Sequence, residues 1–138
     1  MKNIILIAKV LLISFVLTFV LYLFFVITDF IMNNHNADLL LNIDFIVDYH
    51  KVELWQELLI HFLISLSIVV ISLYIYKHLL ILKYFYLLVL LVIFIFLYPA
   101  LIHLSVRGFF VYNLSEFVVW IMGHLLFLVL LHIILKRH

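Results

Sequence analysis

The stretch that decides the fold runs from Glu53 to Lys77 and reads ELWQELLIHFLISLSIVVISLYIYK. Its apolar part is long enough to cross a bilayer as a helix. Glu57, His61 and Ser65 follow one another at intervals of four residues, so they lie on one face of that helix. An ionisable side chain inside a membrane helix is costly and normally faces other helices or a cavity rather than lipid. We therefore expect the other helices to supply partners for this face.

The composition places the whole chain in a membrane. Its 138 residues are 70% hydrophobic and only 11% charged, and a soluble domain of this size cannot bury so much apolar surface. The chain has no cysteine, which excludes disulfides and thiolate metal sites. It also lacks the basic clusters that bind nucleic acid. We expect an all-α integral membrane protein whose main partner is the lipid bilayer.

Four apolar segments predict four membrane-spanning helices in one bundle that covers residues 1–138. The helices are expected at about 8–30, 54–76, 84–104 and 115–135. The first apolar run is longer than a usual signal-peptide core, and no small-residue cleavage site follows it, so we expect it to be retained.

The connection over residues 29–53 is the longest in the chain. It mixes acidic and aliphatic residues, which makes it too apolar for a free loop and too charged for a span. We expect an interfacial helix on the outer face of the bundle, with Asn36 or Asp38 as its N-cap.

The basic residues predict the orientation. Four spans put both termini on one side, and of the 8 Lys and Arg residues only Lys51 and Arg107 then fall on the other side. Because basic residues concentrate on the cytoplasmic side, both termini are predicted to be cytoplasmic.

This topology brings polar residues of three spans to a similar depth. His61 follows Glu53, and His124 follows Glu116, by eight residues each, which is about 12 Å along a helix. His103 approaches the same depth on the third span. The expected cluster in the outer half of the bundle comprises Glu57, His61, Ser65, His103, Arg107, Ser115, Glu116 and His124. Gly123 would let a neighbouring helix come close beside His124.

The segments that carry these residues read HFLISLSIVVISLYIY (61–76), IHLSVRG (102–108) and NLSEFVVWIMGHLLFLVLLHIILKR (113–137). In these segments the chain resembles the YagU-type family of small bacterial inner-membrane proteins, over roughly residues 55–137. The chain differs in being shorter, in being poorer in Gly and in residues 29–52, which show no match. The resemblance implies a multi-pass protein of the bacterial inner membrane and supports the cluster, but it implies no activity.

Three classes of function fit this pattern. We favour a structural or regulatory membrane protein whose buried His/Glu cluster sets packing and responds to pH. The alternative is a metal-binding or metal/proton transport component, in which His61, His103 and His124 bind a divalent metal such as zinc or copper. The weakest is a membrane enzyme acting on a lipid or envelope substrate, because no nucleophile has an adjacent base and no catalytic residue stands out. A homo-oligomer or a larger membrane complex is compatible with each class.

Overall fold

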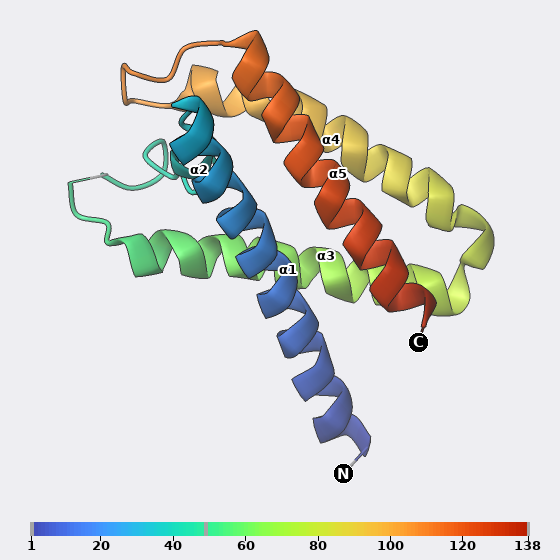
Figure 1. Cartoon of the computed structure of the whole chain (residues 1–138). Coiled ribbons are helices and arrows are strands. Elements are labelled where there is room, and N and C mark those ends of the chain that lie inside the picture. Colours follow the sequence, from blue (N-terminus) through green and yellow to red (C-terminus); the bar gives the residue numbers. More distant parts are fainter. Residues whose placement is uncertain (1, 49, 138) are drawn as a thin grey trace.

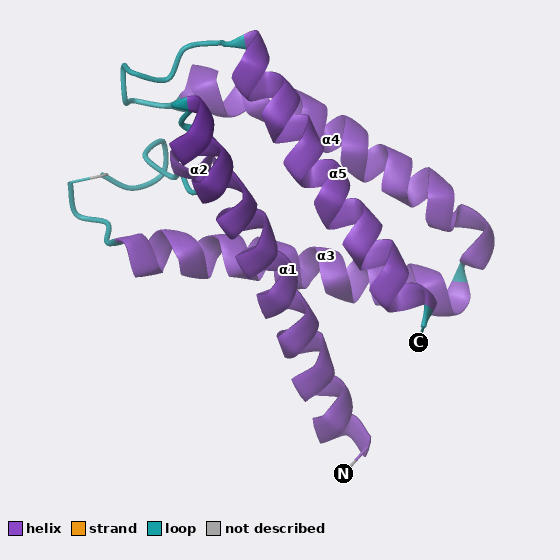
Figure 2. Cartoon of the chain, in the orientation of Figure 1, coloured by secondary structure: helices purple, strands orange, loops and turns teal. Residues whose placement is uncertain are grey.

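The computed structural model describes residues 2–48 and 50–137. Its elements, labelled in Figure 1, are α1 (Lys2–Met32), α2 (Asn36–Leu40), α3 (Leu54–His78), η1 (Leu80–Leu82), α4 (Lys83–Leu104) and α5 (Leu114–Lys136). The described residues contain no strand (Figure 2). In this part of the chain four helices, α1, α3, α4 and α5, are long and apolar enough to cross a membrane. The predicted all-helical chain with four candidate spans is confirmed.

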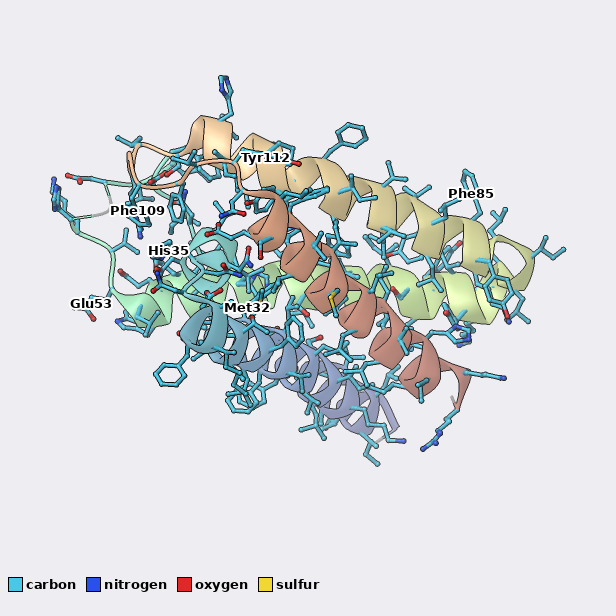
Figure 3. All side chains as sticks on the ribbon, turned by 45° about the horizontal axis from the view of Figure 1, so that its top comes forward. Met32, His35, Glu53, Phe85, Phe109 and Tyr112 are labelled. Atoms are coloured by element: carbon cyan, nitrogen blue, oxygen red, sulfur yellow. The ribbon has the colours of Figure 1, made fainter. Side chains whose placement is uncertain are left out.

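Local sequence signals define the helix ends. The α3 helix begins with a capping box, in which the side chains of Glu53 and Gln56 each bond the backbone of the other residue. At the start of α5 the Asn113 side chain accepts a hydrogen bond from the backbone nitrogen of Ser115. Large apolar side chains remain exposed along the helices, as in Phe30 and Ile81, which are 91% and 95% exposed. Figure 3 shows many such carbon-only side chains pointing outward, as expected for helices whose solvent is lipid.

The helices form an open angle rather than a parallel bundle. The α3 and α4 helices meet at η1 and diverge toward the opposite end of the molecule, which we call the α2 end (Figure 1). The α5 helix packs against α4, and α1 packs against both α3 and α5. The first turns of α1 project beyond these contacts, and residues 4–9 are exposed.

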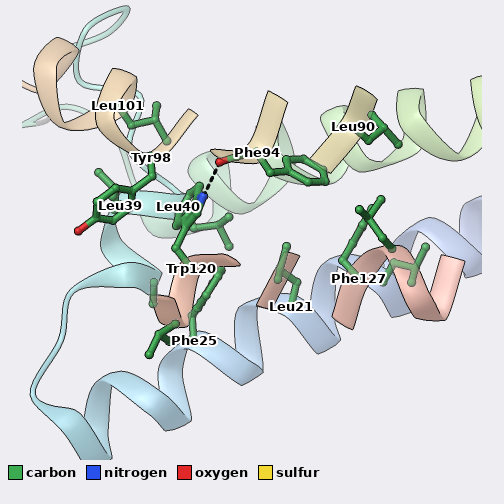
Figure 4. Packing of buried hydrophobic residues seen from close by; sticks show 14 of the residues in the cluster. Leu21, Phe25, Leu39, Leu40, Leu90, Phe94, Tyr98, Leu101, Trp120 and Phe127 are labelled. Carbon is green, nitrogen blue, oxygen red and sulfur yellow. Dashed lines mark hydrogen bonds between the residues drawn. The ribbon is translucent and has the colours of Figure 1, made fainter. Parts of the chain in front are cut away.

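Aromatic side chains fill the core where α1, α4 and α5 meet (Figure 4). Trp120 is fully buried, stacks on Phe25 of α1 with 5.6 Å between ring centroids, and donates a hydrogen bond of 2.9 Å to the Phe94 carbonyl. Gly123 lies one turn further along α5 and admits this contact, because a Cβ there would stand only 2.6 Å from Cζ of Phe25. The expected close approach of a neighbouring helix at Gly123, beside His124, is therefore present.

Over residues 29–53 the structure contains one short helix. The α1 helix continues to Met32, the chain turns at Asn33, which has a φ of 56°, and α2 has five residues. The expected caps, Asn36 and Asp38, are wrong. His35 occupies the N-cap position, and Asp29 at the end of α1 takes over the capping bond, its Oδ2 accepting from the Ala37 backbone nitrogen at 2.7 Å.

Residues 36–44 enter the angle between α3 and α4, and we call them the wedge (Figure 1). The aliphatic side chains of the wedge are buried: Leu39, Leu40, Leu41 and Ile43 are all less than a tenth exposed. The physical reason is tertiary packing: α2 packs against α1 and α5, and Leu39 and Leu40 belong to the same buried core as Trp120. Burying these aliphatic groups removes apolar surface from polar surroundings. The side chain of Asn36 fixes the wedge to α5 by donating to the Glu116 carbonyl at 3.2 Å.

Candidate functional site

A cavity of about 200 Å³ lies in the angle between α3 and α4, and we call it the lateral cavity. Helices α3, α4 and α5 supply most of its walls, and the wedge with the two residues that follow it covers the α2 end. Most lining side chains are apolar. The polar exceptions are Asn42, Glu57, His61, Ser65 and His124.

Several polar atoms around this cavity are buried without a hydrogen bond. Among the described residues, Nδ2 of Asn42, Nε2 of His61 and Oγ of Ser65 have no partner. Ser65 and Asn42 are only 2% and 3% exposed, so bulk water does not satisfy them. Buried polar groups are nearly always paired in folded proteins, and an unpaired one calls for an explanation such as a bound water, an ion or a functional requirement.

His124 presents a defined hydrogen-bonding group to the same cavity. Its ring is 2% exposed, and Nδ1 lies 2.8 Å from the carbonyl oxygen of Trp120. Since a carbonyl can only accept, Nδ1 carries the proton, and Nε2 of the neutral ring is left as an acceptor. The rings of Phe25, Phe94 and Trp120 surround the imidazole, with centroids at 5.7, 4.4 and 4.4 Å. The imidazole is thus held in one orientation by packing and by its own helix.

A second polar group closes the α2 end of the cavity. Nη2 of Arg107 lies 3.0 Å from Oε1 of Glu57, and its Nε lies 3.5 Å from Oδ2 of Asp44. The same Asp44 oxygen accepts from Oγ of Ser105 at 2.8 Å and from the Arg107 backbone nitrogen at 3.2 Å. We call these four residues the Arg107 network. It joins α3, the wedge and the connection between α4 and α5, which are the three segments around the mouth of the angle.

The Arg107 network lies largely out of solvent. The side chain of Asp44 has no exposed surface, and those of Glu57 and Arg107 are 13% and 19% exposed. Ion pairs in such surroundings are screened much less than surface pairs, and each partner depends on the other for compensation of its charge. The network therefore fixes the wedge in position more strongly than a surface ion pair could.

The predicted cluster is brought together only in part. Glu57, His61, Ser65 and His124 all line the lateral cavity, and Arg107 contacts Glu57 beside it. Ser115 is exposed at the start of α5, and Glu116 is half-buried next to it. His103 is exposed near the end of α4.

The three imidazoles predicted to bind metal do not form a site. Within the described residues, no three or more His, Asp or Glu side chains are arranged to hold a metal ion. The reason is helical phase: the buried face of α4 includes Tyr98 and Leu101, and His103 lies two residues beyond Leu101, roughly 200° around the helix. His103 consequently points away from the core that contains His124.

Sequence reasoning missed Asn42, Asp44 and Ser105. All three lie in connections, where no helical period relates them to the residues they contact. The available signal was the placement of Asp44 between Ile43 and Phe45, since an acid inside an apolar run is costly unless it is paired.

Comparison with protein-family models, with curated proteins and with solved structures finds no match to this chain. The fold defines the class of protein as an all-helical chain with four candidate membrane spans. The resemblance to the YagU-type family stays a prediction that rests on the quoted motifs.

Proposed function

We propose that this chain is a small structural or regulatory membrane protein that binds a lipid-soluble molecule in the lateral cavity. The observation that carries the proposal is the set of buried, unpaired polar atoms on Asn42, His61 and Ser65, which the rest of the described chain does not satisfy. A mostly apolar cavity with a few convergent polar groups is the usual form of a small-molecule site. A bound molecule with a polar group would pair these atoms and lower the free energy of the folded protein.

The regulatory part of the proposal follows from the wedge. Leu40, Leu41 and Asn42 belong to the wedge and also line the cavity, so an occupant would touch the segment that the Arg107 network holds. Binding of the ligand and the position of the wedge are then linked. If the wedge exchanges between this position and another, a ligand that binds one position more tightly shifts the equilibrium toward it.

We place the protein in the bacterial inner membrane with both termini in the cytoplasm and the wedge on the outer side. The support is the distribution of basic residues together with the family resemblance over residues 55–137. Lys77 and Lys83 flank η1, at the end of the molecule opposite the wedge.

Filling the cavity tests the proposed function. Ser65→Leu adds an apolar branch inside the cavity, whereas Ser67→Leu adds the same branch at an exposed position of the same helix. Native mass spectrometry of protein released from lipid nanodiscs is expected to show a bound molecule on the wild type and on Ser67→Leu, but not on Ser65→Leu. A wild type without adducts, or equal adducts on both variants, would contradict the proposal.

A further inference from the structure

We infer that the ligand of the lateral cavity has an uncharged hydroxyl head group on a single apolar chain, as in a monoacylglycerol or a long-chain alcohol. This inference rests on the proposed function, because it names the ligand of the same cavity. Three properties of the cavity support it: the hydrogen-bonding character of its polar side chains, the charges beside them and its volume.

The polar side chains among the lining residues suit a ligand that both donates and accepts. Nδ2 of Asn42 can only donate, and Nε2 of His124 can only accept because Nδ1 donates to Trp120. Oγ of Ser65 can do either, and so can Nε2 of His61, because no hydrogen bond within the described residues fixes the tautomer of that ring. A hydroxyl group donates one hydrogen bond and accepts up to two, which suits this mixed set.

Other head groups suit the cavity less well. A hydrocarbon would leave every one of these polar atoms unpaired. An ammonium group has no acceptor for Asn42, and a carboxylate or phosphate has no donor for His124. An anion would also stand near Glu57, whose carboxylate already lines the cavity and whose ion pair with Arg107 is made at 3.0 Å. The lining therefore favours an uncharged head group.

The volume limits how much of the ligand is enclosed. Cavities of roughly 150 Å³ bind benzene, so the cavity of about 200 Å³ holds a head group and a few carbon atoms. The rest of the chain must leave where lining side chains reach the surface, which is at Phe45, Ile46 and Ile64, exposed by 40%, 72% and 53%. These apolar side chains belong to the segment after the wedge and to α3, so the tail would leave sideways into lipid.

Photolabelling of the full chain in phosphatidylcholine nanodiscs tests the inference. Three probes share one diazirine-bearing alkyl chain and end in a hydroxyl, a methyl or an ammonium group, and mass spectrometry of peptides maps the labelled residues. We expect the hydroxyl probe to label cavity residues about tenfold more than the other two, which corresponds to one or two net hydrogen bonds.

Two variants and one control keep this test specific. His124→Phe retains a ring but removes the acceptor, and Ser65→Ala removes only a hydroxyl, so both should reduce labelling by the hydroxyl probe toward the level of the methyl probe. His78→Phe is an exposed position at the η1 end and should change nothing. If His124→Phe does not fold, Ser65→Ala alone tests whether labelling depends on the polar lining.

The outcomes separate the inference from the proposed function. Equal labelling of the cavity by hydroxyl and methyl probes, or preferential labelling by the ammonium probe, would overturn the hydroxyl head group and leave the ligand site intact. An absence of cavity labelling by all three probes would overturn both, because the cavity would then hold only water or nothing. Unchanged labelling in both Ser65→Ala and His124→Phe would also overturn the hydroxyl assignment.

Discussion

Replacing Arg107 with Met is expected to destabilise the protein by about 3–5 kcal/mol, the usual cost of removing one partner from a buried ion pair. The variant keeps an apolar stem of similar length but removes the charge between two carboxylates. At 3.0 Å from Glu57 and 3.5 Å from Asp44, each gross attraction amounts to about 5 kcal/mol with an effective dielectric constant of about 20. Much of this attraction only offsets desolvation in the wild type. The penalty in the variant arises because Asp44 is fully enclosed and loses its counter-charge.

The assay is reversible unfolding of the full chain in mixed micelles, followed by helical circular dichroism. Arg137→Met serves as the control, because Arg137 is exposed at the end of α5 and its replacement should cost less than about 0.5 kcal/mol. Combining Arg107→Met with Asp44→Asn should recover about 1–3 kcal/mol relative to the sum of the single variants. A cost below 1 kcal/mol for Arg107→Met, or strict additivity with Asp44→Asn, would refute the idea that charge compensation holds the wedge.

Three further predictions concern packing, the unpaired imidazole and orientation. Gly123→Ala should cost about 1–3 kcal/mol in the same assay, since its Cβ would meet the Phe25 ring at 2.6 Å; unchanged stability would mean that the ring yields freely. His61→Leu should change stability by less than about 1 kcal/mol, because Nε2 loses no partner in the described part of the chain, and a loss of several kcal/mol would reveal one. Single cysteines at Asp48 and Arg137, both exposed, report orientation: an impermeant thiol reagent on intact cells should label only position 48, and labelling of 137 alone would reverse the topology.

The parts of the structure that could be predicted are those governed by local rules. Length and hydropathy are enough to place four candidate spans, because a helix must satisfy its own backbone in lipid. The interval of four residues likewise places Glu57, His61 and Ser65 on one face, and the structure lines one cavity with all three. The pairing of Glu57 with Arg107 also agrees with the expected cluster.

The predictions that failed concern how the helices are arranged in space. Depth along a span says nothing about direction around it, so the depth predicted for His103 did not bring it to His124, and its side chain is exposed. The burial of Leu39 follows from the packing of α2 against α1 and α5, which no single segment encodes. Asp44 acquires its role only when a connection distant in sequence approaches it.

The position of the wedge has a consequence for biosynthesis. Asp44 precedes its partner Ser105 by 61 residues, so the ribosome delivers the wedge long before the residues that hold it. While only the chain up to α3 has been synthesised, Asp44 lacks the cation of Arg107, and the wedge lacks the walls that α4 and α5 later provide. Nascent chains at this stage carry an uncovered aliphatic segment, which is the kind of surface that chaperones and membrane proteases recognise. Synthesis of α4 and α5 supplies the missing walls of the cavity and withdraws that signal.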